Sequence, residues 1–488
     1  MSKSVIEGLE PKLVWDYFYE ITQVPHPSKK EEKIRAHVRE FANKNSFDFV
    51  EDEVGNIVIK VPATPGYENS QTIVIQGHLD MVCEKNKGTE HDFYNDPLKI
   101  IRDGDWITAE GTTLGADNGI GVAAGMAAAT DDSVIHGPLE LLCTIDEETG
   151  MTGVNALKSD FITGKTLLNL DSEEDGAFYV GCSGGQDTRG YYKLEYSDVD
   201  KTLTTYELMI TGLKGGHSGL DVANGRANAI RLLAQLLNRL EAEIEFDLSS
   251  ISGGSLRNAI PRESEVTILL NSEDESKVKG IIDQFVSDTL LEFNVNDPGL
   301  EVIFEKKESS NDKMLTKEFV SNLIKVLLAA PHGIMAMSPD IPGLVETSTN
   351  LATIDMVDDQ LVIGTSQRSA IDSAKWHISN AVRAIFELGG AVNVDTGDGY
   401  PGWQPNMDSE LLKVSKEVYV EMFNKEPEIK AIHAGLETGL LGSKYPGLDM
   451  ISFGPTIEGA HSPDERLHIA HTAKFYDLVK GILLRYTK

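Results

Sequence analysis

The sequence predicts an α/β protein whose main sheet is mostly parallel or mixed and is sandwiched by helices. Three short apolar runs, at residues 72–76, 139–145 and 167–170, each indicate a buried strand. A segment of small apolar residues at 119–130 separates the first two runs and is expected to form a buried helix. Strands that alternate with helices favour a largely parallel sheet covered on both faces. In such sheets, ligands bind at the carboxyl ends of the strands.

The first elements of the chain carry recognisable start signals. Ser28 and Glu31 have the spacing of a capping box, which predicts the start of a helix. The apolar residues that follow Glu31 have the spacing of one helix face: Ile34, Val38 and Phe41. Two strands are expected next, at residues 47–54 and 56–61, on either side of a glycine turn.

The middle of the chain has a different pattern and predicts an inserted α+β domain. Residues 206–211 and 265–270 alternate as half-buried strands do. Amphipathic helices are expected in this part at residues 225–243, 316–330 and 370–388.

Two glycine-rich segments, at residues 182–185 and 396–402, mark the borders of the insertion. The first domain is therefore expected to be discontinuous, comprising residues 1–185 and 397–488, with residues 186–396 as the inserted domain. Near its end, residues 449–453 predict another core strand, and residues 464–486 contain a closing helix.

Composition and charge restrict the classes of function. The 488 residues are enough for two or more cores, and 41% hydrophobic with 25% charged residues is a globular mixture. The 77 acidic and 44 basic residues give a net charge of −33, which disfavours nucleic acid and anionic membranes as partners. The sequence contains no signal-peptide pattern, no long apolar span and no C-x-x-C pair. We therefore expect a soluble cytoplasmic protein.

Ionisable residues gather at the expected strand ends and in glycine-rich loops. The residues concerned are His78, Asp80, Asp117, Glu147, Glu148, Asp171 and His461. Two histidines and several carboxylates are a typical ligand set for a two-metal hydrolytic site, and mixed nitrogen and oxygen donors suit zinc, manganese or cobalt. Taken singly, each residue also fits an ordinary role, such as a helix cap for Asp117 or a solvated loop for the adjacent glutamates.

Other catalytic patterns are missing from the sequence. It contains no H-E-x-x-H zinc motif, no G-x-S-x-G elbow, no phosphate-binding loop and no dinucleotide-binding glycine motif after a strand. None of the three cysteines has an evident activating histidine in the sequence. With these catalytic patterns absent, a hydrolase with two metal ions is the interpretation that the sequence favours.

Six strings of the sequence together resemble the family of co-catalytic zinc exopeptidases that includes aminoacylases and carnosinases. They are GHLDMV, LGADNGIG, DEETG, NLDSEE, GGHSG and GAHSPDE, and they occur in this order along nearly the whole chain. The long insertion agrees with the dipeptidase branch of the family. The resemblance implies a zinc-exopeptidase-like catalytic domain, with residues 186–396 forming a lid and dimerisation domain.

The resemblance also implies a set of ligands for two divalent metal ions, with zinc expected and manganese or cobalt as alternatives. Asp117 would bridge both ions. His78 and Asp171 would complete one site, and Glu148 and His461 would complete the other.

Three further residues acquire catalytic roles from the resemblance. Asp80 would orient His78, which it can reach because residues two apart on an extended segment face the same side. Glu147 would be the general base, which must stay off the metals to carry a proton to the leaving amine. His217 would polarise the scissile carbonyl, often from the neighbouring subunit, although a glycine-rich turn with an incidental histidine is the alternative.

Substrate contacts are implied for the inserted domain and for the segment after it. Asn258 and Arg368 resemble the pair that holds the terminal carboxylate of a dipeptide, a task that suits the guanidinium fork. His433 and Glu437 match a family segment near the substrate, with roles left open. Residues 345–350 look specific to the branch, and no function follows for them from the sequence.

The sequence therefore predicts a cytosolic dinuclear-metal dipeptidase that acts on small peptides, with Xaa-His (carnosine-like) substrates expected, and that forms a homodimer. One alternative is an N-acyl amino acid amidohydrolase on the same scaffold, because an anchor for a carboxylate serves both. The other is an inactive metal-binding or interaction module, which would be expected to lack a ligand or the base.

Overall fold

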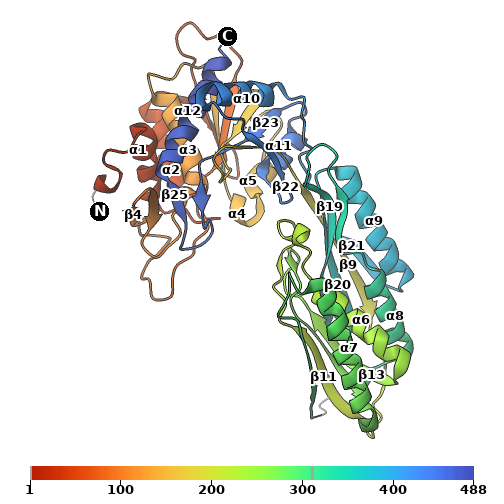
Figure 1. Cartoon of the computed structure of the whole chain (residues 1–488). Coiled ribbons are helices and arrows are strands. Elements are labelled where there is room, and N and C mark those ends of the chain that lie inside the picture. Colours follow the sequence, from red (N-terminus) through yellow and green to blue (C-terminus); the bar gives the residue numbers. More distant parts are fainter. Residues whose placement is uncertain (1–2, 309–312, 488) are drawn as a thin grey trace. The chain divides into compact units, whose positions relative to one another are not determined.

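The computed structural model describes residues 3–308 and 313–487, which form two compact units (Figure 1). Unit 1 comprises residues 1–181, 405–431 and 436–488. Unit 2 comprises residues 182–404 together with the short segment 432–435. Each unit contains a β-sheet with helices packed on it (Figure 1).

The main sheet of unit 1 is mixed, with parallel strands at its centre. Its strand order is β1-β2-β6-β3-β7-β23-β8-β22. The bounds are β1 (Asp48–Glu51), β2 (Ile57–Val61), β3 (Ile73–His78), β6 (Leu139–Thr144), β7 (Thr166–Asn169), β8 (Ala177–Cys182), β22 (Glu428–Ile432) and β23 (Asp449–Ser452). β3 runs parallel to β6 and to β7, and β7 runs parallel to β23, whereas β1–β2, β2–β6 and β8–β23 are antiparallel. The predicted fold class and the strands expected in it are confirmed.

Every residue of the central strands β3, β6 and β7 is buried, so both faces of this sheet are covered. The helices of unit 1 that surround the sheet are shown in Figure 1. They are α1 (Lys12–Thr22), α2 (Glu32–Lys44), α3 (Ala116–Thr130), α4 (Glu147–Gly150), α5 (Thr152–Ala156), α10 (Glu410–Phe423), α11 (Glu437–Lys444) and α12 (Ile469–Arg485). A smaller sheet in the order β24-β25-β5-β4 consists of β4 (Ile100–Asp103), β5 (Trp106–Ala109), β24 (Ile457–Glu458) and β25 (Arg466–His468).

The helix of small residues, α3, packs closely on the central strands. A Cβ atom on Gly77 would collide with the side chain of Asn118, and one on Gly121 would collide with the backbone carbonyl of Leu170. Glycine at these positions therefore lets the start of α3 approach the ends of β3 and β7. This contact brings Asp117, in the first turn of α3, to the carboxyl edge of the sheet.

The capping box predicted at the start of α2 is wrong, although the helix itself is present. Glu31 occupies the N-cap position, and no side-chain capping bond forms there. Its carboxylate instead accepts hydrogen bonds from the backbone N–H groups of Lys29 (2.7 Å) and Asp146 (3.2 Å). The Glu31 side chain thus binds the loop after β6 and does not form the capping bond that the local pattern predicts.

Unit 2 is a layer of helices on one antiparallel sheet. The strand order is β16-β11-β15-β13-β19-β20-β9-β21, and β18 pairs with β19. The bounds are β9 (Gly184–Lys193), β11 (Thr204–Thr211), β13 (Phe246–Gly253), β15 (Ser264–Leu270), β16 (Glu301–Lys306), β18 (Gly333–Met337), β19 (Val345–Val357), β20 (Gln360–Ser369) and β21 (Asn393–Thr396). The helices α6 (Ala229–Glu243), α7 (Glu275–Phe293), α8 (Lys317–Ala329) and α9 (Asp372–Leu388) lie together against the sheet (Figure 1), and their apolar faces form a common core with it.

Short elements complete unit 2. They are β10 (Tyr196–Asp198) paired with β17 (Lys313–Leu315), and β12 (Gly216–His217) paired with β14 (Ala259–Ile260). The helix expected from residue 225 begins only at Ala229, because Asn228 caps it by accepting a hydrogen bond from the Arg231 N–H. Within the described residues, no helix is long and apolar enough to span a lipid bilayer.

Candidate metal centre and substrate cluster

Two groups of possible metal ligands in unit 1 share Asp117. His78, Asp117 and Asp171 form one group, and Asp117, Glu148 and His461 form the other. Within each group, one ligand atom from each residue lies within 4.8 Å of the others. Asp117 Oδ1 is 3.2 Å from His78 Nε2, and Asp117 Oδ2 is 3.1 Å from His461 Nε2. A carboxylate with one oxygen in each group is what a bridged pair of ions requires.

The topology of the sheet explains why these residues meet. His78 is the last residue of β3, Glu148 follows β6 in α4, and Asp171 follows β7. Because β3, β6 and β7 are parallel neighbours, their carboxyl ends lie at one edge. Asp117 enters from the first turn of α3. His461 comes from the loop between β24 and β25, where it adopts a left-handed backbone with φ of 63°.

The chemistry of this donor set fits divalent cations. Among the described residues, Glu148 Oε1 is a buried oxygen without a hydrogen-bond partner, and Asp171 Oδ1, also buried, lies 3.3 Å from His78 Nε2. Burial, together with the charges of Asp117 and Glu148, raises the pKa of Asp171 to about 7. Unpaired carboxylate oxygens are costly to bury, and bound cations would relieve this cost.

Glu147 lies beside the ligand groups, within 4.8 Å of His78 and Glu148 by the same measure. Burial holds the pKa of Glu147 well above its usual value, and the negative charges of Asp171 and Glu437 raise it further. A carboxyl group with a raised pKa beside possible metal ligands is suited to general acid–base work.

Asp80 contacts both the predicted ligand and the predicted base. Its Oδ1 is 3.4 Å from His78 Nδ1, and its backbone oxygen is 3.0 Å from the same nitrogen. Its carboxylate also accepts hydrogen bonds from the backbone N–H groups of Glu147 (3.0 Å) and Glu148 (3.3 Å). A proton on Nδ1 of His78 leaves Nε2 free as a metal donor.

Glu437 also belongs to this edge of unit 1. It is fully buried, and its Oε2 accepts hydrogen bonds from Gln76 Nε2 (2.6 Å) and Thr144 Oγ1 (2.7 Å). Burial raises the pKa of Glu437 to about 8. Its partners are at the ends of β3 and β6, so the side chain ties two strands that carry site residues.

A second cluster, in unit 2, is centred on Arg368. This side chain is 6% exposed, and it donates to Ser218 Oγ at 3.2 Å and to the Tyr400 hydroxyl at 3.0 Å. Its Nη2 is 3.4 Å from His217 Nε2. His433 is buried in the same unit and is 2.7 Å from Ser348 Oγ.

The two histidines of this cluster are neutral at pH 7. Burial and the positive charge of Arg368 lower the pKa of His217 to about 4 and that of His433 to about 3. His217 Nδ1 accepts hydrogen bonds from the N–H groups of Gly219 (3.3 Å) and Leu220 (3.0 Å). Because both of these N–H groups point at Nδ1, the proton of the neutral ring sits on Nε2 and makes His217 a hydrogen-bond donor. The 3.4 Å approach of Arg368 Nη2, which is itself only a donor, is then a contact without a hydrogen bond.

Asn258 reaches the cluster through its backbone, whose carbonyl accepts a hydrogen bond from the Ser218 N–H at 2.8 Å; the residue itself is exposed. The segment 345–350, for which the sequence suggests no role, supports these residues. Ser348 contacts His433, and Asn350 Nδ2 donates to the carbonyl of Ala259 at 2.7 Å. The sequence assigns no role to Tyr400 or Ser348, because their positions beside Arg368 and His433 depend on tertiary contacts.

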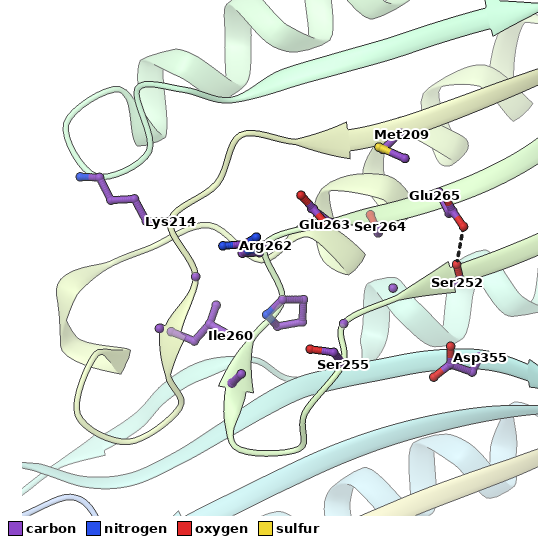
Figure 2. Close-up of a pocket in the computed structure, with 16 residues that line it drawn as sticks. Met209, Lys214, Ser252, Ser255, Ile260, Arg262, Glu263, Ser264, Glu265 and Asp355 are labelled. Carbon is purple, nitrogen blue, oxygen red and sulfur yellow. Dashed lines mark hydrogen bonds between the residues drawn. The ribbon is translucent and has the colours of Figure 1, made fainter. Parts of the chain in front are cut away.

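A separate open pocket of about 640 Å³ lies in unit 2 beside β12, β14 and β15 (Figure 2). Lys214 and Arg262 line it together with the acidic residues Glu263, Glu265 and Asp355. None of the predicted site residues lines this pocket, and its mixed charges favour no single class of ligand.

Comparisons with known proteins place these clusters in context. Residues 74–485 match the model of peptidase family M20/M25/M40. The chain is 39% identical over 480 residues to the cytosol non-specific dipeptidase of Escherichia coli, covering 98% of this chain and 99% of that protein. It is similar to the structure of aminoacylhistidine dipeptidase from Vibrio alginolyticus, with a TM-score of 0.91, 39% identity and 98% of both chains covered. The structure of aminopeptidase PepT from Bacillus cereus shares the fold, with a TM-score of 0.58, 17% identity and coverage of 98% and 100%.

Proposed function

This chain belongs to peptidase family M20/M25/M40, and from that premise we propose that it is a dipeptidase that works with two divalent metal ions. The observation that carries the proposal is Asp117, whose two oxygens lie in two different groups of possible ligands. Full-length similarity to two dipeptidases supports dipeptides as the substrates.

Five side chains would hold the ions. His78 and Asp171 serve one ion, Glu148 and His461 serve the other, and Asp117 serves both. When bound, the ions supply Lewis-acid polarisation of a carbonyl group and a water molecule of lowered pKa. Asp80 would hold the His78 ring and the turn at residues 147–148 in place, since its carboxylate contacts both.

Glu147 is the general base in this proposal. Its carboxylate takes a proton from the attacking water and returns it to the leaving amine. Its position next to the ligand Glu148 and its raised pKa support this role.

The cluster of unit 2 would bind the substrate. Arg368, with Asn258, would hold the terminal carboxylate of the dipeptide through charged hydrogen bonds. Neutral His217 would donate its Nε2 proton to the carbonyl oxygen, on which negative charge develops during attack. The backbone hydrogen bonds to Nδ1 support this assignment, because they fix the tautomer that the role needs.

Finer features of the proposal come from the resemblance and from the relatives. They are zinc as the metal, a cytosolic location, Xaa-His dipeptides as preferred substrates, and a homodimer formed through unit 2. His433 would lie near the substrate, with its role left open.

The test is a comparison of hydrolysis rates for the metal-free and the metal-loaded protein. The substrates are carnosine, Gly-His, dipeptides without histidine, and N-acetyl amino acids. We expect dipeptides to be cleaved only after zinc, manganese or cobalt is restored. Hydrolysis that survives complete metal removal would overturn the mechanism, and preference for N-acetyl amino acids would reassign the enzyme as an amidohydrolase.

A further inference from the structure

A buried carboxylate holds the loop that presents Asp117. Glu465 is 2% exposed, and its two oxygens accept hydrogen bonds from consecutive backbone N–H groups. The donors are Leu114 (2.6 Å) and Gly115 (3.0 Å) to Oε2, and Ala116 (2.8 Å) and Asp117 (3.4 Å) to Oε1. The sequence alone indicates no function for Glu465, which is the last residue of the GAHSPDE string.

The backbone on both sides is shaped for this contact. Gly115 has a φ of 68°, in the left-handed region that glycine adopts easily, and this turn helps aim successive N–H groups at one anion. Thr108 Oγ1 donates to the backbone oxygen of Glu465 at 2.7 Å, which fixes the residue from β5.

Glu465 connects two loops that carry predicted ligands. It lies on the same loop as His461, and the N–H groups that it binds belong to the loop of Asp117. The side chains of these two ligands are 3.1 Å apart although 344 residues separate them in the sequence. The carboxylate of Glu465 is thus a direct tether between the two loops.

We infer that Glu465 is a positioning residue for the two-metal site, which sets Asp117 against His461 and thereby the spacing of the two ions. The inference rests on the proposed function, because it needs Asp117 and His461 to be ligands. Both oxygens of Glu465 accept hydrogen bonds from backbone N–H groups, so the residue would act through Asp117 and His461.

The substitution Glu465→Gln tests this role because it preserves the size of the side chain. An amide NH₂ group in place of one oxygen would face two N–H donors, so half of the tether is lost. The chain offers a matched control in Glu140, which is 3% exposed. Its carboxylate accepts hydrogen bonds from the N–H groups of Thr163 (2.8 Å) and Gly164 (3.0 Å), a loop without predicted ligands.

The experiment uses metal-free full-length protein as wild type, Glu465→Gln and Glu140→Gln. Calorimetric titration with Mn²⁺ gives the affinities, and electron paramagnetic resonance gives the magnetic coupling between the two bound ions. We expect Glu465→Gln to bind at least one ion about 10- to 100-fold more weakly, as supporting partners of metal ligands often do, and to change the coupling. Glu140→Gln is expected to match the wild-type affinities within about twofold, whatever its thermal stability.

If the wild type binds the ions and Glu465→Gln shows the same affinities and the same coupling, the inference is overturned and the proposed function stands. An equal loss of affinity in Glu140→Gln would overturn it too, because the effect would then be general to unit 1. A wild-type chain that binds no ions would overturn the proposed function and the inference together. If Glu465→Gln does not fold, Glu465→Asp keeps the charge on a shorter side chain, and wild-type affinity and coupling in that variant would contradict the inference.

Discussion

At the scale of single residues, the adjacent glutamates after β6 are expected to do different work. Glu147→Gln should retain both metal ions and the fold but lose hydrolysis by about 100- to 10,000-fold, because the proton carrier is gone. Metal analysis and kcat on a cleavable dipeptide check this. Glu148→Gln is the comparison, and it should lose metal affinity as well as activity. Near wild-type turnover in Glu147→Gln would contradict the assignment of the base.

His217 supports a second prediction at this scale. His217→Ala should lower kcat by about 100- to 1,000-fold, as removal of an oxyanion donor does elsewhere. The metal content should stay unchanged, because His217 belongs to unit 2 and the predicted ligands belong to unit 1. Steady-state kinetics with metal analysis on the same sample would check both points. A parallel loss of metal and turnover would point to a structural role instead.

At the scale of elements, two helical glycines should respond to alanine in opposite directions. Gly121 in α3 faces the carbonyl of Leu170, so Gly121→Ala should lower the free energy of unfolding by about 1–3 kcal/mol. Gly280 is exposed in α7, and a Cβ there would meet nothing within 4 Å. Gly280→Ala should therefore stabilise the protein by about 0.5–1 kcal/mol. Urea unfolding of both variants measures these changes, and changes of equal sign would contradict the packing described for α3.

We expect His332, which links α6 to β19, to make the free energy of unfolding depend on pH. Its Nδ1 accepts a hydrogen bond from the Leu351 N–H (3.3 Å) and lies 3.2 Å from the Asn228 amide. Burial and the charge of Arg231 lower the pKa of His332 to about 4. Below pH 6.5 the unfolded chain binds a proton that the folded chain does not, so this stabilisation is complete above pH 6.5 and is lost as the pH falls toward 4.

Denaturant unfolding at pH 7.5 and pH 5 measures the contribution of His332 to the free energy of unfolding. The loss attributable to His332 is on the order of 2 kcal/mol over this interval. His332→Asn should show a correspondingly smaller loss between the two pH values. Equal pH dependence in the wild type and the variant would mean that His332 does not contribute in this way.

Local signals predicted most elements but failed where a tertiary contact competed with them. The strands β3, β6 and β7 were expected because their apolar runs are unambiguous. The capping box at Ser28 and Glu31 failed because Glu31 binds the N–H of Asp146, a partner distant in the sequence. The sequence does not indicate the long strands β19 and β20, because many of their buried positions hold polar residues that hydrogen-bond to neighbouring strands.

At the scale of the whole molecule, metal binding should stabilise unit 1 selectively. Ligands bound only by the folded state add about 2.7 kcal/mol when they are present at 100 times their Kd. Chelation should therefore speed amide hydrogen exchange in unit 1, above all in residues 114–117, and leave unit 2 unchanged. Mass spectrometry of exchanged peptides reads the two units separately. Equal acceleration in both units would argue against ligands confined to unit 1.

The sheet class, most elements and the residue types of the candidate metal centre follow from the sequence, because apolar runs and ligand chemistry are local properties. Carboxylates and histidines at strand ends indicate hydrolysis with two metals without reference to the fold. Which atoms meet depends on tertiary packing. Examples are the place of Asp117 in both ligand groups, the tautomer of His217, the contact of Ser348 with His433, and the tether from Glu465. Those contacts join residues far apart along the chain, and their geometry depends on how sheet and loops pack.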